Sequence, residues 1–90
     1  MINKILYIDI ETNKQGKIGD VGAIFNGQEL HEKQLTKLES WIQQAEYICG
    51  HNIVAHDIPM LEGVLGNEIF QNKKIIDTLL WSPIIFNNNP

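Results

Sequence analysis

Two acidic residues stand two positions apart near the start of the chain, at the end of an apolar run. Residues 7–12 read YIDIET, which places Asp9 and Glu11 at alternate positions. In a β-strand, residues i and i+2 point to the same face, so the two carboxylates would lie side by side. Like charges at that spacing repel each other unless a cation neutralises them. Mg²⁺ and Mn²⁺ prefer oxygen ligands, so the pair is a candidate metal site, although ordinary surface charge gives the same pattern.

A second group of polar residues lies in the middle of the chain, where residues 50–61 read GHNIVAHDIPML. Asp57 precedes an apolar stretch with helical character, so its carboxylate is either a helix N-cap or a third metal ligand. In open α/β sheets, binding sites gather at strand ends, which favours convergence of Asp57 with Asp9 and Glu11. A zinc site formed by His51, His56 and Asp57 is a further alternative, but no cysteine pattern or HExxH motif supports it.

The first third of the chain has the pattern of three strands. Residues 4–10 are nearly all apolar and predict a central strand that is buried on both faces. Residues 19–25 predict a second strand, and Asn26-Gly27 is a strong signal for a hairpin turn. The polar residues 28–33 should then form an edge strand.

The pattern changes to helical spacing after residue 34. Thr36 and Glu39 match a capping box, so a helix is predicted to begin there. Residues 46–49 predict a short strand, residues from Ile58 to Gly66 a second helix, and residues 73–78 a fifth strand. Strands that alternate with helices imply parallel additions to the antiparallel strands. The predicted fold is therefore α/β, with a mixed five-stranded sheet and helices packed on it.

Composition sets limits on the class of protein. Ninety residues with 43% hydrophobic content predict one small globular domain over residues 1–90. The net charge is −4 and the chain has no arginine, which argues against a broad basic patch for nucleic acid. No run approaches the ~20 apolar residues of a membrane helix. Cys49 is the single cysteine, so no intrachain disulfide is possible and we expect a cytoplasmic protein without membrane attachment.

Four segments resemble one family, in the family's order. YIDIET, KIGDVGAIF, ICGHNIVAHDIPML and KKIIDTLLWSP are similar to motifs of the DEDD (DnaQ-like) 3′–5′ exonuclease superfamily, which has an RNase H-like fold. The resemblance implies hydrolysis of phosphodiester bonds at a single-stranded 3′ end of DNA or RNA with two Mg²⁺ or Mn²⁺ ions. It assigns the catalytic and metal-ligand roles to Asp9, Glu11 and Asp57, and a structural role to Asp77. It assigns substrate contacts to Ile10, Thr12, His51 and Asn52.

The sequence also departs from the family pattern. His56 stands where the family usually has another aromatic residue, and it either packs or replaces a catalytic base. The family's last motif, a His or Tyr and an Asp on a final helix, does not occur in these ninety residues. We therefore expect the amino-terminal part of an exonuclease domain, with the terminal helix absent and with weak or no activity by itself. The alternative is a non-catalytic, degenerate nuclease-fold module that binds nucleic acid or a protein.

The end of the sequence is unusually apolar. Residues 79–86 read LLWSPIIF, which is too apolar for a solvated tail. Exposed apolar segments of this kind usually mediate contacts. We expect self-association through this segment, or attachment of the domain to a larger nucleic-acid enzyme.

Overall fold

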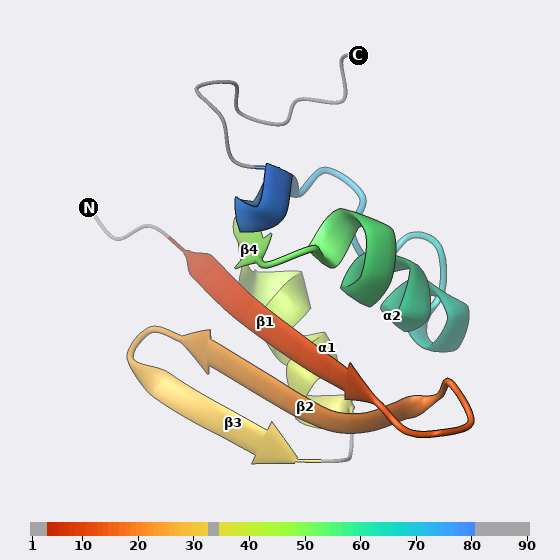
Figure 1. The fold of residues 1–90 in the computed structure, drawn as a ribbon. Helices are drawn as coiled ribbons and strands as arrows, with labels where there is room; N and C mark the ends of the chain where they lie inside the picture. The colour runs from red at the N-terminus through yellow and green to blue at the C-terminus, as the bar shows by residue number, and fades with distance from the viewer. Residues whose placement is uncertain (1–3, 33–34, 81–90) are drawn as a thin grey trace.

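The computed structural model describes residues 4–32 and 35–80 (Figure 1). Its strands and regular helices are, in chain order, β1 (Ile5–Thr12), β2 (Ile18–Phe25), β3 (Gln28–Glu32), α1 (Thr36–Gln44), β4 (Tyr47–Gly50), α2 (Ile58–Leu65) and β5 (Lys74–Asp77). A π-helical turn, η1 (Ile53–Asp57), runs directly into α2, and a 3₁₀ turn, η2 (Thr78–Leu80), follows β5.

The strands form one mixed sheet in the order β3-β2-β1-β4-β5. The pairs β1–β2 and β2–β3 are antiparallel, whereas β1–β4 and β4–β5 are parallel. Parallel neighbours need a crossover connection, and α1 and α2 lie in these two connections. The prediction of a mixed five-stranded α/β sheet with parallel additions is confirmed.

The turn between β2 and β3 sets the register of the edge strand. Asn26 and Gly27 both have positive φ, at 53° and 78°, as a two-residue type I′ hairpin requires. Phe25 consequently pairs with Gln28, and Gly22 pairs with His31 farther along the ladder. The predicted hairpin and edge strand are confirmed.

The hydrophobic core lies on one face of the sheet. The buried side chains from β1, α1 and α2 in this core are Leu6, Ile8, Ile10, Leu38, Trp41, Ile42 and Leu61. Figure 1 shows α1 behind the strands in this view. The crossovers from β1 to β4 and from β4 to β5 proceed in the same direction along the sheet, so a common handedness carries both helices to the same side.

The prediction that β1 is buried on both faces is wrong. Its residues alternate between buried and exposed, and Ile5 and Tyr7 are 42% and 39% exposed. On the neighbouring strand Ile24 is 47% exposed. Since both helices lie on the other side, no described element covers the face that carries Tyr7, Asp9, Ile24 and His31. We call this side of the sheet the open face.

The helix boundaries agree with the sequence, but one predicted cap does not form. Helix α1 begins at Thr36 as expected, yet Leu35 occupies the N-cap position and no side chain caps the helix. The capping-box prediction is therefore wrong. Helix α2 has Pro59 in its first turn and ends at Gly66, whose φ of 107° few other residues tolerate.

The apolar segment 79–86 lies outside the described residues from position 81 onward. Over residues 4–32 and 35–80, no helix is long and apolar enough to cross a membrane.

Candidate functional site

Asp9 and Glu11 share one face of β1, as the strand alternation predicted, and this is the open face. The antiparallel ladder places Gly22 opposite Asp9, and Asp20 opposite Glu11. Both carboxylates are exposed, and no described lysine forms an ion pair with either of them. Asp9, Glu11 and Asp20 line one cavity of about 100 Å³. The pair thus presents oxygen ligands to solvent without a neutralising partner, which suits a hard divalent cation.

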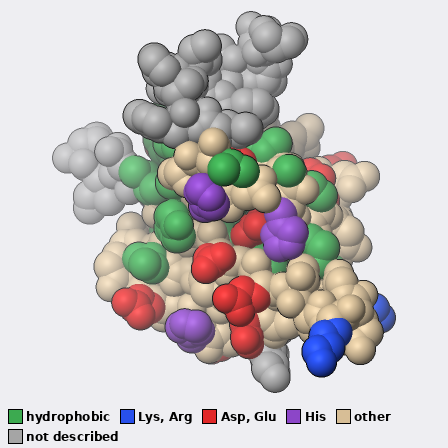
Figure 2. Space-filling view, viewed as in Figure 1, with side chains coloured by type: hydrophobic (Ala, Val, Ile, Leu, Met, Phe, Trp, Pro, Cys, Tyr) green, Lys and Arg blue, Asp and Glu red, His purple; other side chains and the backbone are tan. Residues whose placement is uncertain are grey.

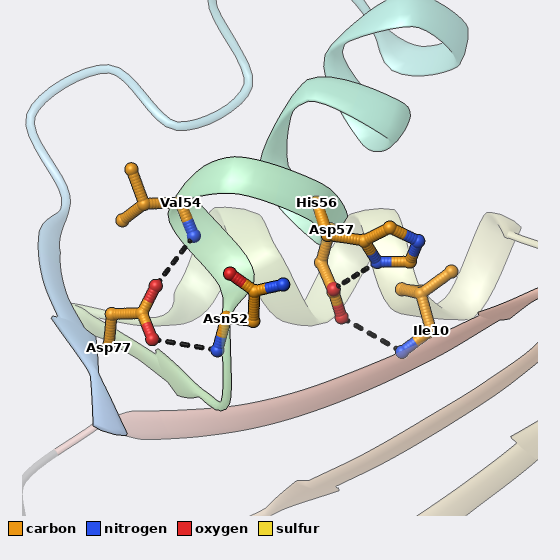
Figure 3. A network of polar contacts seen from close by, with 6 residues as sticks. All are labelled: Ile10, Asn52, Val54, His56, Asp57 and Asp77. Atoms are coloured by element: carbon orange, nitrogen blue, oxygen red, sulfur yellow. Dashed lines mark hydrogen bonds and ion pairs between the residues drawn. The ribbon is translucent and has the colours of Figure 1, made fainter. Parts of the chain in front are cut away.

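Asp57 lies beside β1, at the junction of η1 and α2. Its side chain is buried, and its carboxylate is bonded through both oxygens. The Ile10 backbone N–H donates to Oδ2 at 2.9 Å, and the His56 ring nitrogen Nδ1 lies 2.7 Å from Oδ1 (Figure 3). Because Ile10 separates Asp9 from Glu11 in β1, this bond attaches Asp57 to the strand between the two exposed carboxylates.

The alternative prediction that Asp57 caps the second helix is wrong. No side chain caps α2. The π-helical turn continues into the helix without a break, and the Ile58 N–H already bonds to the Ile53 carbonyl. The helix start therefore leaves no need for the Asp57 carboxylate, which bonds to β1 instead.

The surroundings of Asp57 oppose its ionisation. Burial raises the pKa of the Asp57 carboxyl group, the bonds from His56 and from the Ile10 N–H lower it, and the charge of Asp9 raises it. The influence of Asp9 reflects the proximity of the two groups. Even so, no three His, Cys, Asp or Glu side chains in the described part of the chain are grouped as metal ligands. The structure brings Asp57 near the exposed pair but leaves its oxygens bonded within the protein.

Asp77 supports the same loop from the opposite side. It is 4% exposed, and its carboxylate accepts backbone N–H groups from Asn52, Val54 and Leu79 at 2.7, 2.9 and 3.0 Å. Figure 3 shows η1 held between Asp77 and Asp57. The structural role predicted for Asp77 is confirmed.

The residues named for substrate contact have different surroundings. The Ile10 side chain is buried in the core and its N–H is bonded to Asp57, whereas Thr12 is exposed at the end of β1. His51 is exposed, and its Nδ1 lies 3.1 Å from the Thr78 hydroxyl. Asn52 has a left-handed backbone, with a φ of 63°, just before η1.

The zinc alternative is not supported by this geometry. The His51 ring bonds to Thr78 beside β5, while the His56 ring bonds to Asp57. Within residues 4–32 and 35–80 these side chains do not form a three-ligand group.

Two further residues of the open face were not identified from the sequence. Asp20 pairs with Glu11, and His31 lies across Gly22 from Asp9, lining the same cavity. The Asn26-Gly27 turn could have placed His31 on this face, because a two-residue hairpin fixes which β3 residue lies opposite each β2 residue. In Figure 2, acidic side chains gather on this side of the molecule with histidines around them, and lysines appear only toward one edge.

The comparisons with known proteins support the fold. No protein-family model matches the sequence, and no curated protein matches it either. Among solved structures, the chain is similar to the family B DNA polymerase from the hyperthermophilic archaeon Pyrobaculum calidifontis, with a TM-score of 0.68 and 13% sequence identity. The match covers 88% of this chain and 16% of the polymerase chain. The chain therefore shares its fold with a part of that polymerase chain, in a mixed α/β arrangement consistent with an RNase H-like fold.

Proposed function

We propose that the chain forms a metal-dependent nuclease domain of the DEDD type, which acts on the 3′ end of single-stranded DNA or RNA. The observation that carries this proposal is the exposed pair of carboxylates, Asp9 and Glu11, on the open face of a sheet whose fold also occurs in a DNA polymerase. The motif resemblance around Asp9, Glu11 and Asp57 supports the choice of a 3′–5′ exonuclease among nucleic-acid enzymes.

The charge of the open face explains why such a domain would need a divalent cation. Asp9, Glu11 and Asp20 line one cavity, so an approaching phosphate meets like charge. A bound Mg²⁺ or Mn²⁺ would neutralise this charge and lower the pKa of a coordinated water. Asp9 and Glu11 fit such an ion, because they are exposed carboxylates on one face with no described lysine paired to them.

Asp57 fits the same ion only after a change in its contacts. Its Oδ2 atom receives the Ile10 N–H of β1, and its Oδ1 atom is bonded to His56. In the arrangement described, this residue fixes η1 to β1 at Ile10, between the two exposed carboxylates in the sequence. Asp77 fixes the other end of η1, so the loop that carries His51 and Asn52 is held at the end of β4.

A second function is favoured by the same bonds of Asp57. A carboxylate that is fully bonded within the protein does not need a cation, and the described His, Cys, Asp and Glu residues form no three-ligand group. In this alternative the domain is a non-catalytic module that binds nucleic acid or a protein. The fold match to 16% of a polymerase chain supports either function as one part of a larger nucleic-acid enzyme.

A degradation assay tests the proposal. Single-stranded DNA and RNA oligonucleotides labelled at the 5′ end are incubated with the protein and Mg²⁺, Mn²⁺ or EDTA. Because the family's last motif does not occur in these ninety residues, the proposal predicts slow shortening from the 3′ end that EDTA abolishes and that Asp9→Asn removes. Oligonucleotide binding without shortening in either metal would favour the non-catalytic module. A protein that neither binds nor shortens the oligonucleotides would contradict the nuclease proposal.

A further inference from the structure

We infer that His56 is a positioning residue that holds the Asp57 carboxylate away from a divalent cation, so that the cation must displace the imidazole to gain a third carboxylate ligand. This inference rests on the proposed metal site at Asp9 and Glu11. In this inference His56 controls whether Asp57 can join Asp9 and Glu11 as a third carboxylate ligand.

The contact between His56 and Asp57 is short, and Asp57 is the more buried of the two side chains. Nδ1 of His56 lies 2.7 Å from Oδ1 of Asp57, and the two residues are adjacent in the π-helical turn. The Asp57 side chain is only 5% exposed while the His56 side chain is 36% exposed. An ion arriving from solvent therefore meets the imidazole before it reaches Oδ1.

The two bonds of Asp57 differ in how readily they can be exchanged. Oδ2 is bonded to the backbone N–H of Ile10, which is fixed in the sheet because β1 is paired with β2 at this position. Oδ1 is bonded to a side chain that can rotate toward solvent, because more than a third of it is already exposed. Oδ1 is therefore the atom of Asp57 that can be released to a cation.

The electrostatics of the site favour this exchange. The Asp57 carboxylate is buried, and its oxygens are bonded to one backbone N–H and one imidazole nitrogen. A divalent cation among Asp9, Glu11 and Asp57 brings more positive charge to these groups than one imidazole can. The imidazole bond must still be broken first, and this lowers the apparent affinity for the ion.

Two substitutions of His56 distinguish whether its imidazole opposes binding of the cation or helps it. His56→Phe keeps an aromatic ring of similar size and removes the nitrogen that bonds to Oδ1. His56→Gln keeps a side-chain donor and serves as the conservative control. Each chain is titrated with Mn²⁺ at pH 8, and free Mn²⁺ is measured by electron paramagnetic resonance. Thermal unfolding in EDTA confirms that each variant is folded.

The inference predicts that His56→Phe binds Mn²⁺ about tenfold more tightly than the parent chain, a change of about 1.4 kcal/mol. His56→Gln should bind as the parent does, and Asp57→Asn combined with His56→Phe should lose the gain. In the parent chain, Mg²⁺ should also shift the NMR signals of the His56 ring.

The opposite results overturn the inference and identify the cause. Equal or weaker Mn²⁺ binding by His56→Phe, with binding by the parent intact, would show that the imidazole does not oppose the ion, and would leave the proposed metal site standing. If neither chain binds Mn²⁺, both the inference and the proposed metal site fail.

Discussion

Asp77 and Asp9 carry the same functional group in opposite surroundings. The Asp77 carboxylate is buried and accepts three backbone N–H groups, whereas the Asp9 carboxylate is exposed on a face shared with Glu11 and Asp20. A buried carboxylate that satisfies backbone donors contributes to folding. An exposed carboxylate beside like charges opposes folding in the metal-free protein.

Substitution of each acid by alanine should therefore have different effects on stability. Asp77→Ala leaves the N–H groups of Asn52, Val54 and Leu79 without their acceptor, so we expect the free energy of unfolding to fall by about 3 kcal/mol. Asp9→Ala removes repulsion that no cation offsets, so the free energy of unfolding in EDTA should stay the same or rise. Urea denaturation of both variants measures these values. A clear loss of stability in Asp9→Ala would show that this acid forms structural bonds.

The sequence allowed the exposed pair to be predicted but not the bonds of the third acid. Asp9 and Glu11 share a face because the backbone of any strand alternates, which needs no knowledge of other elements. The bond from the Ile10 N–H to Asp57 joins residues 47 positions apart and depends on the path of η1. The His56 contact depends on the same turn, so neither bond follows from local pattern.

At the scale of elements, η1 is positioned by the close approach of β4 and β1. A Cβ atom added at Gly50 would lie 2.7 Å from the Ile8 carbonyl oxygen and would clash with the Ile53 side chain. Gly50 thus ends β4 where only a hydrogen atom fits, and the next residues turn into the loop that leads to Asp57. Short π-helical turns such as η1 are frequent at functional sites.

A pair of glycine substitutions tests this positioning. Gly50→Ala should lower the free energy of unfolding by about 3 kcal/mol, because the added methyl group meets backbone of β1 and the buried Ile53. Gly63→Ala in α2 is the matched control, since nothing lies within 4 Å of its added Cβ atom. It should raise stability by about 0.5–1 kcal/mol through helix propensity. Thermal and urea unfolding give both values, and equal stabilities for the two variants would contradict the account of Gly50.

The order of the elements could be predicted from the sequence, but the exposure of one face of β1 could not. Local signals such as Asn26-Gly27 and Gly66 mark turns and helix ends by their backbone demands. The burial of β1 depends on which side its helices occupy, and this follows from the handedness of the crossovers. Ile5 and Tyr7 therefore read as core residues in the sequence, although they are exposed in the structure.

At the scale of the whole molecule, the open face combines two kinds of surface. Ile5, Tyr7 and Ile24 are exposed apolar side chains, while Asp9 and Glu11 lie farther along β1. The apolar run of residues 79–86 begins at Leu79, which is 50% exposed. Apolar surface of this kind tends to be covered by contact with another chain.

Self-association of the ninety-residue chain is the expected consequence. Light scattering should give an average mass that rises above 10.3 kDa with concentration. Leu79→Ser should reduce the rise if the segment that it begins is the contact, and Ile24→Ser reports separately on the open face. A constant monomer mass at high concentration would contradict the prediction.

The binding of Mn²⁺ to the open face tests the central claim most directly. Parent protein, Asp9→Asn and Glu29→Gln are titrated with Mn²⁺, and the free ion is followed by electron paramagnetic resonance. Glu29 lies on β3 opposite the exposed Ile24, so its substitution changes the net charge by the same amount on the same face. The account predicts binding by the parent, an affinity weaker by about tenfold or more in Asp9→Asn, and no change in Glu29→Gln. Equal affinities in all three proteins, or no binding by the parent, would contradict a metal site at Asp9 and Glu11.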